Sequence, residues 1–425
     1  MYRPIPRSAR DDTSTVKIRR MVPRTIRLAR EVRKAACLAA LAATGCGGSA
    51  PVAAPEPAPP PDRCILPTGD PGEPRELVVA ALRPGDSTVV ARQRPEPLIR
   101  LDCFGVARPG AAESWTPDSS HRTWTFVLAP SALDVTAAGA ATEWRTRPDA
   151  ATTLRYAGIA SVIPLDRRRL VVTLDRPADS VPALFADRSL GLVTDSLPPM
   201  GTTFIARRPA SGDPRDALDG GADVLRTGDP AILQYARTRN ELTVHPLPWT
   251  RTYVLVVPPG REGIGALIPA DSTDFRAGLA RDAVLVEARG AEPPFWWDGM
   301  GPCAESETLP SPQDAVGTNA VVYAREDAVA RALAERVVAL SDQPATAASG
   351  LPSRPMAEAL RGGFGQAYVV AVPRPALVPC REVAAWPAGS TLIPLIETRM
   401  SVIVRRGVPR LTVELDGGLR AVDAP

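Results

Sequence analysis

Apolar residues in this chain repeat with two different periods, and the alternation between them most constrains the fold. Residues 320–323 (AVVY) form a short continuous apolar run, which is typical of a buried strand. Between residues 329 and 340 the apolar positions lie three or four apart, the spacing of one helix face. A second helix is predicted over 356–360 and a returning strand over 368–372. Helices and strands that interleave in this way predict an α/β or α+β class.

Other short apolar or alternating runs predict further strands. They lie at 77–82, 123–128, 159–165, 170–174 and 253–257. The third and fourth of these runs are separated only by a charged tetrapeptide, which predicts a hairpin. A short helix is predicted over 213–218, because an Asp-Pro pair begins it and a Gly-Gly pair follows it.

The net charge of +3 is distributed unevenly. Residues 1–45 contain nine Arg and two Lys but only three acidic residues, so the rest of the chain is mildly acidic. A surface that binds nucleic acid is therefore not expected. Lys17 and Lys34 are the only lysines. The lack of lysine after residue 34 excludes a Walker-A phosphate site and Schiff-base chemistry.

The N-terminal segment has the pattern of a bacterial lipoprotein signal peptide. Basic residues at 24–34 precede a nine-residue apolar run at 35–43, much shorter than the roughly 20 residues that cross a bilayer. Residues 43–46 (ATGC) resemble a lipobox, although that motif prefers Leu in place of the first Ala. We predict a signal peptide over 1–45, lipidation at Cys46 and a lipid-anchored protein of the periplasm or cell envelope. The alternatives are an ordinary secretory signal, or an arginine-rich tail with an incidental cysteine.

Residues 46–62 are rich in proline and are predicted to form an extended tether. In the polyproline II conformation a chain rises about 3.1 Å per residue, so this segment spans a few tens of Å. Such a spacer lets an anchored domain stand clear of a membrane surface.

Four cysteines remain after the signal peptide and Cys46, namely Cys64, Cys103, Cys303 and Cys380. An even number in an exported chain indicates disulfides, for which three connectivities exist. Sequence proximity favours Cys64–Cys103 and Cys303–Cys380, and buried free thiols are the alternative. No CxxC motif and no cysteine–histidine cluster occurs, so neither a metal nor another cofactor is predicted.

No motif for catalysis is present. His121 lies in a polar turn and His245 at the end of a predicted strand, and neither has a ligand set beside it. The chain lacks GxSxG, GxGxxG and SxxK sequences, and nothing selects a catalytic pair among its carboxylates. We therefore predict that the protein is not an enzyme. An exported hydrolase is an alternative without a motif to support it.

One stretch of the chain resembles a known family. Residues 109–128 contain PGAAESWTPD and RTWTFVL, which resemble the PGLAESW and TWTFxLR blocks of the family 5 extracytoplasmic solute-binding proteins. These are the peptide-, nickel- and oligosaccharide-binding subunits of bacterial ABC importers. Weaker blocks follow in the family's order. They lie at 135–138, 159–177, 216–223, 252–255 and 275–282.

The chain also departs from the family pattern. The LRxGvkFhDG block is shortened at 128–134, and Gly139 stands where the family has Asp. The segment that gives the family an acidic contact to peptide amines is not recognisable, and the second lobe is short. The fold is therefore expected to carry over better than the ligand.

The resemblance implies a two-lobed periplasmic-binding-protein-like fold of type II, in the α/β class, with a reduced second lobe. We place lobe I at 63–253 and 390–425, and lobe II at 254–389. In such proteins a peptide or small solute binds between the lobes, a hinge closes, and ABC permease subunits recognise the closed form. A monomer is expected. The alternative is an envelope lipoprotein that uses this scaffold for sensing, assembly or protein contact without transport.

Candidate ligand-binding residues come from the aromatic residues, which make up only 5% of the chain. Trp249 precedes the expected crossing between the lobes. A dense cluster follows, with Phe295, Trp296, Trp297 and Asp298. Flat rings bury a large area at a low entropic cost, which suits a solute cleft. A structural aromatic cluster close to Cys303 is the alternative.

Other large or charged residues are expected to have structural roles. Trp115 and Trp124 are expected in the core. Arg399, Arg405 and Arg406 are expected on a solvated face, because the chain contains many arginines.

Overall fold

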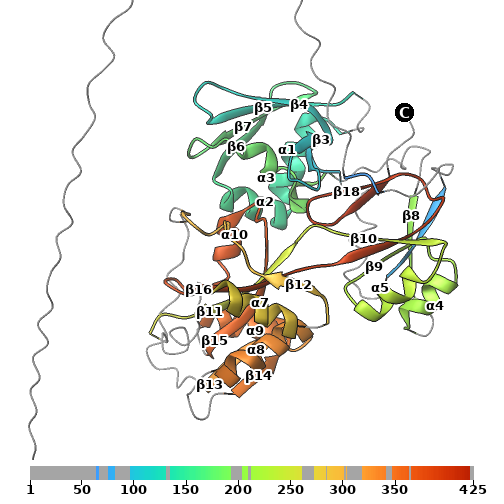
Figure 1. Cartoon of the computed structure of the whole chain (residues 1–425). Coiled ribbons are helices and arrows are strands. Elements are labelled where there is room, and N and C mark those ends of the chain that lie inside the picture. The colour runs from blue at the N-terminus through green and yellow to red at the C-terminus, as the bar shows by residue number, and fades with distance from the viewer. Residues whose placement is uncertain are drawn as a thin grey trace, which may run out of the picture. The chain divides into compact units, whose positions relative to one another are not determined.

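The computed structural model describes most of the chain after residue 63 (Figure 1). The described residues are 64–66, 75–81, 96–130, 135–192, 203–208, 212–260, 272–283, 285–300, 303, 318–340, 347–362 and 365–421. All of them belong to one compact unit, residues 59–425. The signal peptide, Cys46 and the tether lie outside the described residues, so the statements about them stay predictions.

Both ends of the described chain meet in a five-stranded sheet. Its order is β10 (Leu242–Pro246), β17 (Ser401–Arg405), β9 (Val224–Thr227), β1 (Glu76–Ala80) and β8 (Thr203–Arg207). β1 runs parallel to β8 and β9, whereas β17 runs antiparallel to β9 and β10. Helices α4 (Pro214–Asp219) and α5 (Pro230–Arg237) pack on this sheet. Each begins with a capping aspartate followed by proline, so the helix predicted over 213–218 is confirmed.

Residues 96–192 build a second part around a four-stranded antiparallel sheet. Its order is β4 (Ala112–Pro117), β5 (Thr123–Leu128), β7 (Arg169–Leu174) and β6 (Ile159–Pro164). β6 and β7 form the predicted hairpin. Trp124, Phe126 and Leu128 alternate into the core and pack against α1 (Ala137–Thr146) and α2 (Pro148–Tyr156). Trp115 lies at the edge of the same core, so both tryptophans have the expected structural role.

Smaller elements complete this second part. The hairpin of β2 (Ile99–Leu101) and β3 (Ala107–Pro109) precedes the sheet. The short helices α3 (Val181–Leu184) and η3 (Arg188–Leu190) follow it. The two short helices bring residues 181–190 back beside β2, where the backbone N–H of Ile99 donates to the carbonyl of Phe185.

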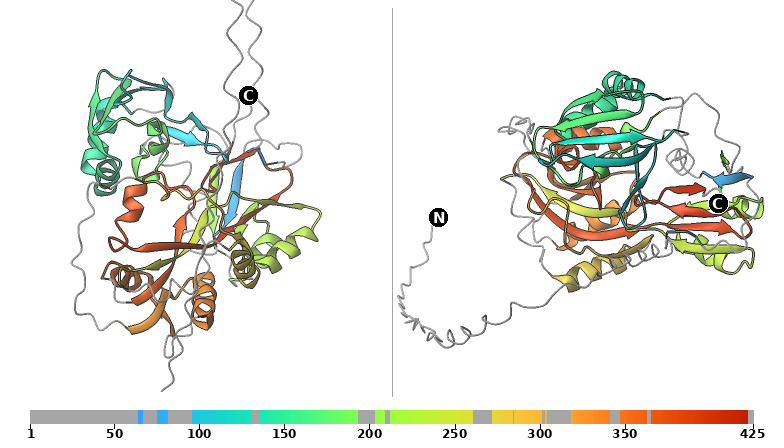
Figure 2. Two further views of the ribbon diagram at one scale, coloured as in Figure 1. Left: turned by 60° about the vertical axis from the view of Figure 1, so that its left-hand side comes forward. Right: turned by 90° about the horizontal axis from the view of Figure 1, so that it is seen from above.

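A six-stranded mixed sheet forms the third part (Figure 2). Its order is β12 (Glu287–Gly290), β16 (Thr391–Arg399), β11 (Arg251–Val257), β15 (Gly365–Pro373), β13 (Thr318–Ala324) and β14 (Ala347–Leu351). Helices α7 (Thr273–Asp282) and α8 (Ala328–Leu340) share one apolar cluster with its strands, and α9 (Ser353–Gly362) shares another. The central strand β11 contributes alternate residues to the two clusters, which places the helices on opposite faces. The strand and helices predicted over 320–360 are thereby confirmed.

The α/β class is confirmed. The order of the strands also shows which parts of the chain share a sheet, and this can be compared with the proposed lobes. β1 and β17 come from opposite ends of the chain and share one sheet, while 251–399 supplies the six-stranded sheet. The proposed lobe border at 253/254 falls within β11, and the border at 389/390 falls just before β16; both strands belong to the six-stranded sheet. The borders themselves stay a prediction.

Two disulfides join Cys64 to Cys103 and Cys303 to Cys380. Their Cα–Cα distances are 5.6 and 5.4 Å. This is the connectivity that sequence proximity favoured, in place of free thiols. The first ties the start of the described chain to the β2–β3 hairpin, and the second holds α10 (Pro379–Val383), which contains Cys380.

Candidate ligand-binding cleft

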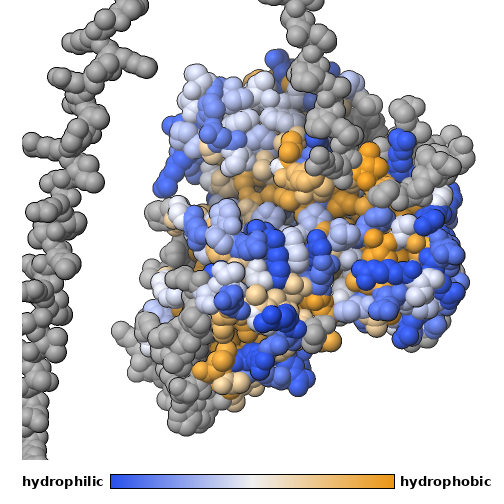
Figure 3. All heavy atoms as spheres, in the orientation of Figure 1, coloured by the Kyte–Doolittle hydropathy of each residue, from blue (hydrophilic) through white to orange (hydrophobic). Residues whose placement is uncertain are grey.

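A cavity of about 270 Å³ lies where four segments meet. The segments are 97–101 with β2, 186–188 at η3, 373–382 from the end of β15 to α10, and the turn at 414–416 between β18 (Leu411–Val413) and β19 (Leu419–Ala421). Figure 3 shows apolar side chains gathered on the face of the molecule between the four-stranded part at the top and the parts below it. The cavity thus lies between the part with the four-stranded sheet and the part with the six-stranded sheet.

Apolar and charged side chains share the wall of this cavity. The apolar ones are Pro97, Ile99, Leu101, Pro373, Pro375, Ala376, Leu377 and Leu415. The charged ones are Arg100, Asp187, Arg188, Arg381, Glu382, Glu414 and Asp416. An apolar enclosure with a few fixed polar groups is the usual composition of a small-molecule site.

Arg381 connects two parts of the molecule beside the cavity. Its Nη2 lies 3.0 Å from Oδ2 of Asp187, and its Nη1 donates to Oγ1 of Thr153 at 3.1 Å. The Asp187 side chain is only 9% exposed, and its other oxygen accepts from the backbone N–H and the hydroxyl of Ser189. α10 is therefore attached to η3 by an ion pair with a buried carboxylate, and to α2 by a hydrogen bond.

A second ionic cluster lies behind the turn at 414–416. Arg420 of β19 has its Nη1 2.7 Å from Oε2 of Glu96, and its Nε donates to Oε1 of Glu414 at 3.1 Å. Burial raises the pKa of Glu96 above its ordinary value, and the opposing charges of Arg420 and Arg100 do not cancel this effect. The guanidinium of Arg420 thus pairs with two carboxylates, those of Glu96 and Glu414, beside this turn.

A second cavity of about 630 Å³ borders the Cys303–Cys380 disulfide. Its walls come from α1, α2, β6 and the segment 174–178, together with Cys303 and Cys380. α10 contributes to both cavities, because Cys380 lines the larger one while Arg381 and Glu382 line the smaller one. The position of this short helix therefore affects both spaces.

The predicted aromatic cluster covers one face of the six-stranded sheet. Phe295 stacks on Trp297 with ring centres 4.8 Å apart, and the rings of Trp296 and Trp386 are 5.6 Å apart. The indole N–H of Trp296 donates to the carbonyl of Pro373 at 2.7 Å. Asp298 is exposed, and its carboxylate accepts from the backbone N–H of Phe295. These four predicted residues do not line either cavity, and their role as ligand contacts stays a prediction.

Trp249 lies in an ionic network and lines neither of the two cavities. The guanidinium carbons of Arg289 and Arg399 are each 4.6 Å from the centre of its ring. Arg289 also pairs at 2.7 Å with Glu397, whose side chain is fully buried. The expectation of a solvated face for Arg399 was wrong, because Arg399 packs on Trp249 and pairs with Glu287, leaving its side chain 25% exposed.

The remaining candidate groups have ordinary surroundings. His121 is exposed beside Asp179, and His245 is partly buried in β10, where burial lowers its pKa. Arg406 is exposed, whereas Arg405 donates to the carbonyls of Leu218 and Ala222. The described residues contain no group of three or more His, Cys, Asp or Glu placed to hold a metal ion. In that same part of the chain, no helix is long and apolar enough to cross a membrane.

The residues around the first cavity were not identified from the sequence. Leu101, Asp187, Arg381 and Glu414 are brought together from positions up to about three hundred residues apart. The sequence next to each of these residues indicates only a turn or a helix end; Asp187, for example, caps the start of η3. No local signal predicts that these particular turns meet.

Comparison with known proteins gives one short sequence match and broad structural similarity. No protein-family profile matches the chain. A stretch of 88 residues, 20% of the chain, is 35% identical to the periplasmic oligopeptide-binding protein OppA of Haemophilus influenzae. That match spans only 16% of the length of OppA. A match this short does not show that the chain has the activity of OppA.

Three solved structures cover most of the chain. The complex of Haemophilus influenzae OppA with RPPGFSPFR matches 84% of this chain and 100% of its own, at 14% identity and a TM-score of 0.50. The peptide-binding pheromone receptor PrgZ matches 83% and 100%, at 12% identity and 0.53. NikZ from Campylobacter jejuni, in complex with Ni(L-His), matches 82% and 98%, at 10% identity and 0.52.

These similarities confirm the resemblance to the family 5 solute-binding proteins and the two-lobed fold of type II. Because the structural identities are low, they establish the fold alone. OppA is named as an oligopeptide-binding protein and PrgZ as a peptide-binding receptor, in agreement with the prediction that this chain is not an enzyme.

Proposed function

We propose that this chain is the lipid-anchored solute-binding subunit of a bacterial ABC importer, and that it binds a peptide or another small solute by hinge closure. The observation that carries the proposal is the cavity of about 270 Å³ enclosed by four separate segments. Three of these segments belong to the proposed lobe I, and the fourth, 373–382, belongs to the proposed lobe II. A solute in this cavity would therefore contact both lobes, which is what closure around a ligand requires.

The size and lining of the cavity favour a small solute. Sites for small molecules usually measure about 300–1,000 Å³, and this cavity, at about 270 Å³, lies just below that range. Its walls present both guanidinium and carboxylate groups, so a solute with polar or charged ends fits better than a purely apolar one. The names of the structurally similar proteins, which refer to peptides and to a nickel–histidine complex, are consistent with such solutes. ABC permease subunits are the partners proposed for the closed form, and a monomer is proposed for the free protein.

A second candidate function is an envelope lipoprotein that keeps the scaffold for sensing, assembly or protein contact. The contact of Arg381 with Asp187 and Thr153 favours it, because a side chain of one part bridges directly to the other. A scaffold held closed in this way needs no ligand to adopt a defined shape.

Thermal unfolding in the presence of candidate solutes separates the two functions. The purified protein is heated with panels of short peptides, sugars and metal ions. A solute at 100 times its dissociation constant should stabilise the protein by about 2.7 kcal/mol, which is a clear rise in the unfolding temperature. A rise with one class of solute supports the transport subunit. If no class changes the unfolding temperature, the second function replaces the first.

A further inference from the structure

The tip of the β2–β3 hairpin exposes two apolar side chains. Phe104 is 66% exposed and Val106 is 51% exposed, and they flank Gly105. Single apolar residues on a surface are common and need no explanation. Here, however, two of them project from one loop of four residues, 103–106.

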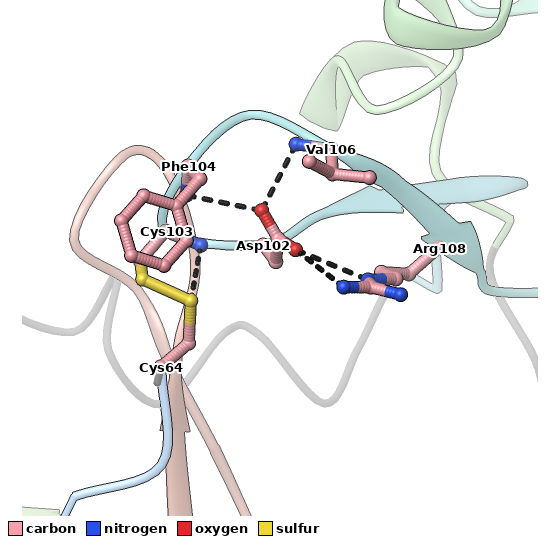
Figure 4. Close-up of a disulfide and its surroundings, with 6 residues drawn as sticks. All are labelled: Cys64, Asp102, Cys103, Phe104, Val106 and Arg108. Carbon is pink, nitrogen blue, oxygen red and sulfur yellow. Dashed lines mark hydrogen bonds and ion pairs between the residues drawn. A yellow bond between two sulfur atoms is a disulfide. The ribbon is translucent and has the colours of Figure 1, made fainter. Parts of the chain in front are cut away.

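The loop is built to hold this shape (Figure 4). Oδ1 of Asp102 accepts the backbone N–H groups of Phe104 and Val106, at 3.0 and 2.9 Å. Its other oxygen lies 2.9 Å from Nη2 of Arg108. The backbone N–H of Gly105 donates to the carbonyl of Asp102, and φ of +81° at Gly105 favours glycine there. Because the turn is already ordered, Phe104 can contact a partner without a large loss of backbone entropy.

The disulfide places this loop at the root of the proposed tether. Cys103 is bonded to Cys64, and the two Cα atoms are 5.6 Å apart. Cys64 follows Cys46 by eighteen residues, so the segment between them spans about 55 Å in the polyproline II conformation and at most about 65 Å when fully extended. The point where the tether enters the folded unit is therefore adjacent to Phe104.

The polar groups beside the loop suit the headgroup region of a membrane. Asp102 is 8% exposed, and its carboxylate accepts hydrogen bonds from the loop backbone and pairs with Arg108. The Arg108 side chain remains 50% exposed. An exposed ring with a neighbouring exposed guanidinium matches the headgroup region of a bilayer, where aromatic rings and cationic groups are both favoured.

We propose that the 103–106 loop contacts the membrane interface beside the lipid anchor, with Phe104 inserted among the lipid headgroups. The proposal rests on the proposed lipid anchoring at Cys46. It gives the loop a second function besides linking β2 to β3, because a second contact next to the tether root restricts how the anchored domain can turn. A lipid chain alone would leave the domain free to rotate on its tether.

Fluorescence of the reconstituted lipoprotein tests the contact. Phe104→Trp is introduced into the full chain, and the mature protein is purified from cell membranes. It is reconstituted into vesicles of phosphatidylethanolamine and phosphatidylglycerol, with or without brominated acyl chains, which quench indoles in the bilayer. The parent protein is measured in parallel so that its own tryptophans are subtracted. Leu340→Trp is the matched control, because Leu340 is also exposed but ends α8, far from β3 in Figure 1.

The expected result is a loss of the added emission in brominated vesicles for Phe104→Trp and no loss for Leu340→Trp. Val106→Trp is the second variant, should the first fail to fold. Equal emission in both kinds of vesicle for the loop variants overturns the proposal while leaving solute binding untouched. The mass of the mature N-terminus is measured on the same sample. A mass without acyl groups overturns both the anchor and the loop contact, whereas the thermal shift with solutes still decides the binding function independently.

Discussion

Arg381 and Asp187 form an ion pair between α10 and the segment at η3, with Nη2 and Oδ2 3.0 Å apart. The two residues come from parts of the molecule built on different sheets, and they lie on the wall of the same cavity. The pair therefore couples the position of the six-stranded part to that of the four-stranded part. If the two parts are the moving lobes, this contact belongs to the closed arrangement and must break when the cleft opens.

Arg381→Gln should destabilise the protein and favour a more open arrangement. Removing one partner of a buried ion pair costs about 3–5 kcal/mol. Since the Arg381 side chain is 34% exposed, we expect a smaller loss of about 1–2 kcal/mol. Denaturant unfolding measures the loss, and small-angle X-ray scattering measures the radius of gyration.

Arg354→Gln is the control for this variant. Arg354 is 91% exposed and pairs with Glu358 on the same helix, so its loss should change stability by less than about 0.5 kcal/mol. If Arg381→Gln behaves like this control in both measurements, the ion pair does not hold the two parts together.

A tryptophan in the smaller cavity should abolish solute binding. Ala376 lines the cavity of about 270 Å³, and an indole in its place would fill much of that space. Ala376→Trp should therefore eliminate the solute-dependent rise in unfolding temperature while leaving the ligand-free protein folded.

Ala160→Trp is the matched variant in the larger cavity. Ala160 is exposed on β6 and lines the cavity of about 630 Å³. The Ala160→Trp variant should leave the solute-dependent rise in unfolding temperature unchanged. The opposite pattern, with binding lost only in Ala160→Trp, would move the solute site to the larger cavity.

The local elements of this fold could be predicted, because they depend on patterns of a few residues. The alternation of Trp124, Phe126 and Leu128 predicted a half-buried strand, and these side chains are buried in β5. Asp213 followed by proline predicted a helix start, and its side chain accepts the backbone N–H of Arg215 at 2.9 Å. Sequence proximity likewise favoured the two disulfides that the structure contains.

The cavity could not be predicted, because its residues have no common local pattern. Asp187 and Arg381 each look like surface residues next to a short helix, and only the packing of α10 on α2 brings them together. The aromatic residues at 295–297 gave a stronger sequence signal, yet they pack on the six-stranded sheet with Trp386. The sequence showed that aromatic residues are concentrated at 295–297. It did not show whether they pack on a sheet or line a ligand-binding cleft. The same limitation explains Arg399, whose contact with Trp249 depends on the pairing of β12 with β16.

Loss of the Cys303–Cys380 disulfide should weaken solute binding as well as stability. It links residues 77 apart, and the chain-entropy model gives about 4 kcal/mol for a loop of this length. Cys380 adjoins Arg381, so the double variant Cys303→Ser, Cys380→Ser should also raise the dissociation constant of any solute found.

The other disulfide supplies the comparison. Cys64–Cys103 links residues 39 apart and should contribute a similar free energy, again about 4 kcal/mol. Because Cys103 is two residues from Leu101 of the cavity wall whereas Cys380 adjoins Arg381, Cys64→Ser with Cys103→Ser should raise the dissociation constant less than loss of Cys303–Cys380 does. Calorimetric titration and denaturant unfolding of both double variants check this. Equal weakening of binding in the two would show that the disulfides act only through overall stability.

Cys46→Ser should release the protein from the membrane. In the proposed lipoprotein, acyl chains on Cys46 provide the anchor. Fractionation of cells that express the full chain measures the distribution between membrane and soluble fractions. Cys37→Ser is the matched control, because Cys37 lies within the predicted signal peptide. A membrane-bound Cys46→Ser protein would contradict lipidation at this residue.

Glu96→Gln should change how stability depends on pH. Burial raises the pKa of Glu96 above its ordinary value of 4.5, so the folded protein holds this proton more tightly than the unfolded chain does. As the pH rises above about 4.5, the unfolded chain releases the proton first, and the free energy of unfolding falls. The amide cannot ionise, so the stability of the variant relative to the parent should rise between pH 4.5 and neutral pH. Arg420 keeps Glu414 as its counter-charge in the variant. Denaturant unfolding across this pH range measures the difference, with the exposed Glu335→Gln as a control that should show no such trend. A variant that is less stable than the parent by the same margin at every pH would show that the pairing with Arg420 outweighs the burial of the carboxylate.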